Sequence, residues 1–191
     1  MCGRYFVDDS DLNISEIYNA VNEQQAYAPE QLSFSLSTGE IFPTNIVPVI
    51  TGSNEYKAMK WGFAGYNSRP IINARSETAY QKPMFRNSII ERRCLVPASG
   101  YYEWQKIENK KQKYLFTSPE NAVFYMLGCF KIEQGSLLPN FVILTRDATE
   151  LIQVIHDRMP VIVTANAGDE WLNRGEGDYP QLVDEVNFVP V

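Results

Sequence analysis

Metal-ligating residues are scarce in this chain of 191 residues, which contains three cysteines and one histidine. The cysteines are Cys2, Cys94 and Cys129, and no two of them form a Cys-X-X-Cys pair. A single histidine cannot complete one of the common zinc patterns from such a set. We therefore expect neither a metal nor another cofactor.

Long apolar runs are also missing. No stretch approaches the ~18 apolar residues of a membrane span. The N-terminus lacks the basic region followed by an apolar stretch that marks a signal peptide. An odd number of cysteines without an export signal favours free thiols in a reducing compartment. We expect a cytoplasmic protein without membrane contacts, with residues 1–191 forming a single domain.

Positive charge is lacking near both ends of the chain. Residues 7–23 hold five acids and no Lys or Arg, and residues 168–186 hold six acids and one Arg. Residues 57–93 instead carry eight Lys and Arg against two acids, within a net charge of −6. That net charge has the wrong sign for a generic nucleic-acid binder. The basic middle favours a polyanion on one face, although ordinary surface scatter explains the same distribution equally well.

Apolar periodicity predicts a helix over 13–25. Residues 76–93 are predicted to form two short helices that separate near Pro83. The segment 39–51 has β character but contains Pro43 and Pro48, which predicts an edge strand or a kinked one. Further β-rich segments are predicted at 56–63, 94–106, 112–117, 122–132, 140–145, 159–164 and 187–191. A hairpin turn is predicted at 108–111, a short helix at 147–154 and a helical turn at 169–173. Without regular βαβ alternation, the order predicts an α+β fold: a mostly antiparallel sheet or irregular β-barrel with short peripheral helices.

Cys2 lies directly behind the initiator methionine. Removal of Met1 would leave an α-amine and a thiol on adjacent carbons. The amine titrates near ~7.7–8.0 and a free thiol near ~8.5, so useful fractions of both nucleophiles exist near neutral pH. An aldehyde captured by the amine gives an imine, and the thiol can close on it to form a five-membered thiazolidine. The alternative is that Cys2 is merely a small residue near a frayed terminus.

Two further side chains are suited to proton transfer. Glu103 lies among aromatic residues, and desolvation there would raise its pKa; an exposed position on the wet face of a strand is the alternative. His156 lies at a junction between a helical stretch and a strand. Asp157 and Arg158 beside it either orient the ring or pair with each other, and a lone histidine can also be structural.

The run from Asn73 to Thr78 is compact and polar. Ser76 or Asn73 can cap a helix, with Glu77 near its positive end. That explanation accounts for Ser76 and Glu77, and it leaves Asn73 and Arg75 available for phosphate or sugar contacts.

Together these pieces resemble the SRAP family, the SOS-response-associated peptidase or abasic-site processing proteins. The matching segments follow family order across nearly the whole chain. They are Met1-Cys2-Gly3-Arg4, Pro43-Thr44 with Val47-Pro48-Val49, Trp61-Gly62, Asn73-Ala74-Arg75-Ser76-Glu77-Thr78, Arg92-Arg93-Cys94-Leu95-Val96-Pro97-Ala98-Ser99-Gly100-Tyr101-Tyr102-Glu103-Trp104, and Leu144-Thr145 followed by His156-Asp157-Arg158-Met159-Pro160.

The resemblance implies a compact β-rich fold with a positively charged groove for single-stranded DNA, including single-strand/double-strand junctions. It implies that Cys2, freed of Met1, captures the ring-opened aldehyde of an abasic site as a thiazolidine DNA–protein crosslink that protects the lesion. The peptidase name refers to removal of whatever precedes the cysteine, here Met1. The implied protein is a monomer without metal or cofactor, cytoplasmic and associated with the nucleoid when bound to damaged DNA.

The resemblance also assigns roles. Cys2 is the nucleophile, Glu103 assists proton transfer, His156 helps to open or orient the sugar, and Asn73 holds the N-terminal residue or the lesion. The implied DNA contacts are phosphate contacts from Arg4, Arg75 and Arg158, base stacking by Pro43 and Trp61 at ~1–3 kcal/mol per base, and Thr145 near the site.

The segment from Phe63 to Ser68 departs from the family pattern, so DNA contacts around 63–70 are not carried over. Two other functions also fit the sequence. One is a cysteine hydrolase that uses Cys2 with His156 and an acid, whose chemistry would survive acetylation of the N-terminus. The other is a non-catalytic single-strand-binding module, which would tolerate Cys2→Ala.

Overall fold

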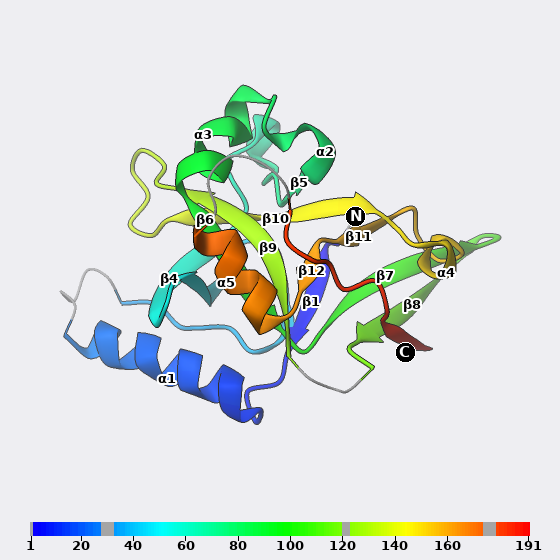
Figure 1. Ribbon diagram of the computed structural model, residues 1–191, viewed down its shortest axis with the longest axis horizontal. Helices are drawn as coiled ribbons and strands as arrows, with labels where there is room; N and C mark the ends of the chain where they lie inside the picture. The colour runs from blue at the N-terminus through cyan, green and yellow to red at the C-terminus, as the bar shows by residue number, and fades with distance from the viewer. Residues whose placement is uncertain (1, 28–32, 120–122, 174–178) are drawn as a thin grey trace.

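The computed structural model describes residues 2–27, 33–119, 123–173 and 179–191, and two β-sheets dominate it (Figure 1). One sheet has the strand order β13-β8-β7-β1-β2, and the other has the order β11-β10-β4-β3-β6-β9-β12 with β5 paired to β10. The strands are β1 Arg4–Val7, β2 Gly39–Ile41, β3 Ile46–Gly52, β4 Glu55–Trp61, β5 Asn73–Arg75, β6 Arg93–Ala98, β7 Gly100–Ile107, β8 Lys110–Thr117, β9 Phe124–Lys131, β10 Asn140–Asp147, β11 Arg158–Pro160, β12 Ile162–Val163 and β13 Asn187–Pro190. The helices are α1 Leu12–Ala26, η2 Tyr66–Ser68, α2 Ser76–Ala79, α3 Pro83–Glu91, α4 Glu150–Gln153 and α5 Ala165–Asn173.

The central strands of the larger sheet pair in a closed ring. Strand β10 pairs with both β4 and β9, so the path β10-β4-β3-β6-β9 forms a closed circuit. The pairs β10–β4 and β10–β5 are parallel, whereas the other strand pairs in the described part of the chain are antiparallel. The predicted α+β fold with mostly antiparallel strands is therefore confirmed, and the circuit is irregular rather than a clean barrel. No helix within the described ranges has the length and apolarity to cross a membrane.

Helices lie outside the sheets, as the sequence predicts (Figure 1). Helix α1 begins where the Asp11 carboxylate accepts the backbone N–H groups of Asn13 and Ile14. Its buried residues are Ile14, Ile17, Tyr18 and Val21, the apolar stripe expected from the 3.6-residue period. The break between α2 and α3 falls at Pro83, which starts α3 in the first-turn position that proline tolerates.

Strand β3 rules out one of the two alternatives predicted for the segment 39–51. It carries Pro48 but lies between β4 and β6, so it is not an edge strand. Its pairing with β4 runs from Ile46 to Gly52, whereas its pairing with β6 is registered only at Ile50 opposite Leu95. Proline cannot donate to a ladder, and the sparse β3–β6 pairing accommodates that loss.

Strand β1 lies in the interior of the smaller sheet. Strand β1 lies between β2 and β7, with Tyr5 opposite Tyr101 and Arg4 opposite Tyr102. One further step in this antiparallel register places Gly3 opposite Glu103. The chain therefore arrives at Cys2 beside the middle of β7.

Strand β10 brings two distant segments together. On one side it pairs with β5, with Arg75 opposite Thr145. It also pairs with β11, with Asp147 opposite Arg158. The polar run after Asn73 and the segment after His156 thereby meet along a single strand.

Candidate functional site

Cys2 is fully buried, and its thiol donates to the backbone carbonyl of Arg4 at 3.5 Å. Burial raises the pKa of this thiol well above its ordinary value, and the nearby Glu103 carboxylate raises it further. The ordinary thiol pKa near ~8.5 that was expected for Cys2 from the sequence is therefore wrong for this conformation. Inside the protein the thiolate loses the water that stabilises it, so Cys2 is held as a neutral thiol.

Asn73 contacts the N-terminal segment directly. Its Nδ2 donates to the Cys2 carbonyl oxygen at 2.8 Å from the start of β5. Its Oδ1 is buried and accepts no hydrogen bond within the described part of the chain. Asn73 therefore fixes Cys2 and has an acceptor left over.

Glu103 is buried on β7, with 2% of its surface exposed. Burial raises the pKa of its carboxyl, an effect that the nearby His156 partly opposes. The exposed alternative considered from the sequence is therefore wrong. A carboxyl that keeps its proton above the ordinary range is equipped to act as an acid and then as a base.

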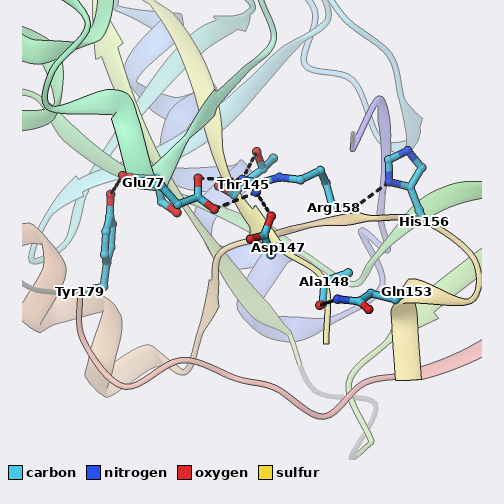
Figure 2. A network of polar contacts seen from close by, with 9 residues as sticks. Glu77, Thr145, Asp147, Ala148, Gln153, His156, Arg158 and Tyr179 are labelled. Atoms are coloured by element: carbon cyan, nitrogen blue, oxygen red, sulfur yellow. Dashed lines mark hydrogen bonds and ion pairs between the residues drawn. The ribbon is translucent and has the colours of Figure 1, made fainter. Parts of the chain in front are cut away.

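His156 lies at the predicted junction, between α4 and β11, and its Nε2 is 3.8 Å from Glu103 Oε2. Its Nδ1 accepts the backbone N–H of Arg158 at 3.0 Å (Figure 2). A nitrogen that accepts cannot carry the proton, so this contact assigns the neutral ring a proton on Nε2, facing Glu103. The exposed Asp157 carboxylate also lies 2.9 Å from Nδ1, and a hydrogen bond there belongs to the charged ring, in which Nδ1 is protonated.

Arg158 is enclosed by acceptors (Figure 2). Its guanidinium binds both oxygens of Glu77, at 2.7 and 2.9 Å, contacts Asp147, and donates to the Thr145 carbonyl at 2.7 Å. The side chains of Arg158 and Thr145 are both buried. In this conformation neither side chain presents an open surface to a DNA phosphate, contrary to the expectation from the resemblance.

Three other expected DNA contacts retain exposed surface. Arg75 is exposed and Pro43 is partly exposed. Arg4 is also partly exposed, although its guanidinium packs 3.9 Å from the centroid of the Phe42 ring and its Nε lies 3.6 Å from Glu40. These residues can meet a ligand without repacking the core.

Trp61 is the clearest disagreement with the expected site. The ring is fully buried, and its Nε1 donates to the Ile72 carbonyl at 3.0 Å. It packs edge-on against Tyr5, with 5.1 Å between the ring centroids, and is stacked with Phe141, with 6.4 Å between the ring centroids. With no exposed face, the indole is not placed to stack on a base.

Sequence reasoning missed the partners of Arg158. Glu77 was assigned only to a helix end, and Asp147 was not singled out. The available signal was the position of Arg158 against the apolar strand that continues with Met159, because a buried arginine is almost always paired. Which acids supply the pairing depends on how β10 is flanked, and the sequence does not reveal that.

A large pocket lies elsewhere on the molecule, not at Cys2 and Glu103. A hollow of about 780 Å³ lies along α1, away from the residues discussed above. Its lining is largely neutral and polar: Asp9, Ser15, Tyr18, Asn19, Asn22, Gln25, Ala26, Phe34, Ser35, Leu36 and Thr38. Across the described ranges no group of three or more His, Cys, Asp or Glu could hold a metal ion.

These features define a small α+β protein in which Cys2, just before strand β1, lies near a buried acid. The family model described as SOS response associated peptidase (SRAP) matches residues 1–189, so the chain belongs to this family.

Curated relatives agree with that membership, and a solved structure shares the fold. The chain is 31% identical to the abasic site processing protein YoqW of Bacillus subtilis strain 168, covering 91% of this chain and 80% of that protein. It is 29% identical to YoaM of the same strain, covering 91% and 79%. A crystal structure from Bacteroides thetaiotaomicron superposes with a TM-score of 0.77 at 24% identity, covering 100% of this chain and 92% of the other. That structural likeness shows the fold.

Proposed function

We propose that this protein processes abasic sites in single-stranded DNA by capturing the ring-opened sugar aldehyde on Cys2. The names of its relatives support the substrate. The observation that carries the chemistry is the 2.8 Å hydrogen bond from Asn73 to the Cys2 carbonyl. It fixes the N-terminal residue in the same site as the buried Glu103 carboxyl.

The reaction begins by exposing the amine. Water adds to the Met1 carbonyl carbon, and the Met1–Cys2 peptide bond breaks to give free methionine and the Cys2 α-amine. This hydrolysis corresponds to the peptidase in the family name.

Capture then proceeds in two bond-forming steps. The amine attacks the aldehyde carbon, and loss of one water gives an imine. The Cys2 sulfur adds to the carbon of the protonated imine, whose nitrogen keeps its proton, and the thiol proton passes to the Glu103 carboxylate, which completes the thiazolidine. Since burial keeps the thiol protonated, the amine reacts first. Glu103 delivers a proton to the departing hydroxyl and, as a carboxylate, receives the thiol proton.

His156 acts on the sugar. Opening the closed hemiacetal moves a proton from the C1 hydroxyl to the ring oxygen. The protonated Glu103 carboxyl gives its proton to the ring oxygen and takes up the C1 hydroxyl proton on its other oxygen. The Nε2–H of His156, 3.8 Å from Glu103, hydrogen-bonds and orients the sugar while keeping its own proton.

DNA binding is assigned to Arg75, which is exposed, and to Arg4 and Pro43, which are partly exposed. Phosphate contacts supply affinity without reading sequence, so the protein recognises the lesion and the strand state, including single-strand/double-strand junctions. It acts as a monomer without a metal.

The decisive experiment combines purified protein with single-stranded DNA that carries one abasic site. The wild-type protein gives a heat-stable shifted band, whereas Cys2→Ala gives none and Cys2→Ser gives at most a reducible imine. Intact mass of the free protein records whether Met1 has been removed.

The same assay separates the two alternatives. No adduct from protein whose mass lacks Met1 would contradict capture and favour a non-catalytic binding module. An adduct that survives N-terminal acetylation would instead indicate thiol chemistry of the hydrolase type. That second outcome is disfavoured by the raised pKa of Cys2, because hydrolase cysteines have a lowered pKa.

A further inference from the structure

Glu77 has a contact that its place at a helix start does not require. It lies in the first turn of α2, where an acid is favourable on its own. Its two carboxylate oxygens nevertheless grip Arg158, 81 residues further along the chain, in a bidentate pair of 2.7 and 2.9 Å (Figure 2). Such a pair fixes direction as well as distance.

Arg158 carries this constraint to His156. Its backbone N–H donates to His156 Nδ1, and this bond favours the neutral ring that keeps its proton on Nε2. Strand β11 begins at Arg158, has three residues, and lies at the end of its sheet. A strand this short has few backbone bonds to hold its register, so the side-chain anchor at its first residue is important.

We propose that Glu77 is a positioning residue for His156: by holding Arg158, it keeps the neutral imidazole with its proton on Nε2, directed at Glu103. The inference deepens the proposed function, because it concerns the same proton-transfer pair.

Without the Glu77 carboxylate, the Arg158 guanidinium loses two of the hydrogen bonds that hold it in place. The Thr145 carbonyl remains, as does Asp147, whose side chain is 80% exposed and therefore free to follow solvent. The charged groups around the ring are then Glu103 from β7, the adjoining Asp157, and an Arg158 no longer tied to α2. Asp157 accepts a proton borne on Nδ1, so the tautomer shifts toward that nitrogen.

The test uses the fact that His156 is the only histidine in the chain. Nitrogen-15 NMR of the imidazole therefore reports one ring without assignment ambiguity. Above the pH at which the ring titrates, wild-type protein should show a protonated Nε2 and a bare Nδ1. Glu77→Ala should raise the Nδ1–H fraction, and Glu77→Gln, which keeps one acceptor oxygen, should fall between the two.

Glu91→Ala is the matched control. Glu91 is also a helix glutamate with an arginine partner, 3.2 Å from Arg92, but it lies on α3 away from this network. It should leave the tautomer unchanged. If Glu77→Ala fails to fold, the intermediate shift in Glu77→Gln decides the question.

Crosslinking kinetics give a second readout. At saturating DNA, Glu77→Ala should slow adduct formation by about 10-fold to 10²-fold, the range expected when a reacting group is misplaced by ~1 Å. The dissociation constant for undamaged single-stranded DNA should not change.

Two results would overturn the inference. One is an unchanged tautomer in folded Glu77→Ala. The other is tighter DNA binding with an unchanged tautomer, which would show that Glu77 merely masks Arg158 from phosphate. Failure of the wild-type protein to form any adduct would count against the proposed function instead, while the NMR result would still judge the role of Glu77.

Discussion

A single glutamate shows how burial serves chemistry and opposes stability. Glu103 is almost fully buried, and its raised pKa means that the folded protein holds the proton more tightly than the unfolded chain does. Between the unfolded and folded pKa values, the native state therefore binds more protons. Stability contributed by protonated Glu103 is present below the unfolded pKa and is lost as pH rises through the folded pKa.

Glu103→Gln should therefore stabilise the folded protein at neutral pH while slowing crosslink formation. A neutral amide of similar shape avoids the cost of a buried charge. Thermal unfolding measured from pH 7 downward should show the gain shrinking as the wild-type carboxyl becomes protonated. Glu108→Gln, at the exposed hairpin turn, is the control for simple loss of a negative charge. A gain that is equal at every pH would contradict this account.

At the scale of elements, the indole of Trp61 joins strands that the sequence keeps far apart. Trp61 is the last residue of β4, and its indole N–H donates to the carbonyl of Ile72, just before β5. The ring also contacts Tyr5 of β1 and Phe141 of β10. Packing of this kind places β1, and hence the N-terminal residue, relative to the larger sheet. The ring is better described as a support for the site than as part of the DNA surface.

Trp61→Phe should lower the free energy of unfolding by about 1–3 kcal/mol, from the lost hydrogen bond and the space left by the smaller ring. The affinity of the folded protein for single-stranded DNA should be unchanged. Urea unfolding and fluorescence anisotropy measure the two quantities separately. Weakened DNA binding at full stability would restore the stacking role.

Local signals explain which elements could be predicted. Short stretches of neighbouring residues are enough to predict the apolar period of α1, its cap at Asp11 and the helix break at Pro83. The interior position of β3 and the burial of Trp61 depend instead on pairings between distant strands, for which a single sequence offers no register. The same holds within the site. Glu103 could be proposed from its aromatic neighbours, but the Glu77–Arg158 pair requires knowing that α2 and β11 both flank β10.

At the scale of the whole molecule, the net charge of −6 opposes a polyanionic ligand. DNA binding must therefore depend on a few local cations, and it should be sensitive to salt. Since Arg75 is exposed whereas Arg158 is enclosed by carboxylates, the two arginines should contribute differently.

Arg75→Ala should weaken binding to all sequences alike and reduce the slope of log K against log salt by about 0.7, the value for one phosphate of a single strand. The measurement belongs in a Cys2→Ala background, where no covalent product forms. Lys111→Ala, at the start of β8 near the hairpin turn, should leave the slope unchanged. Sequence-dependent losses in Arg75→Ala would contradict a backbone contact.

The interior position of β1 has a consequence for the order in which the protein is made. Cys2 is translated before its neighbouring strands β2 and β7, and β7 ends only at Ile107. Asn73, which holds the Cys2 carbonyl, is translated next, and Glu103 follows 30 residues later. A nascent polypeptide therefore carries Cys2 before these two side chains can surround it, and the proposed capture site is assembled only after β7 has been made.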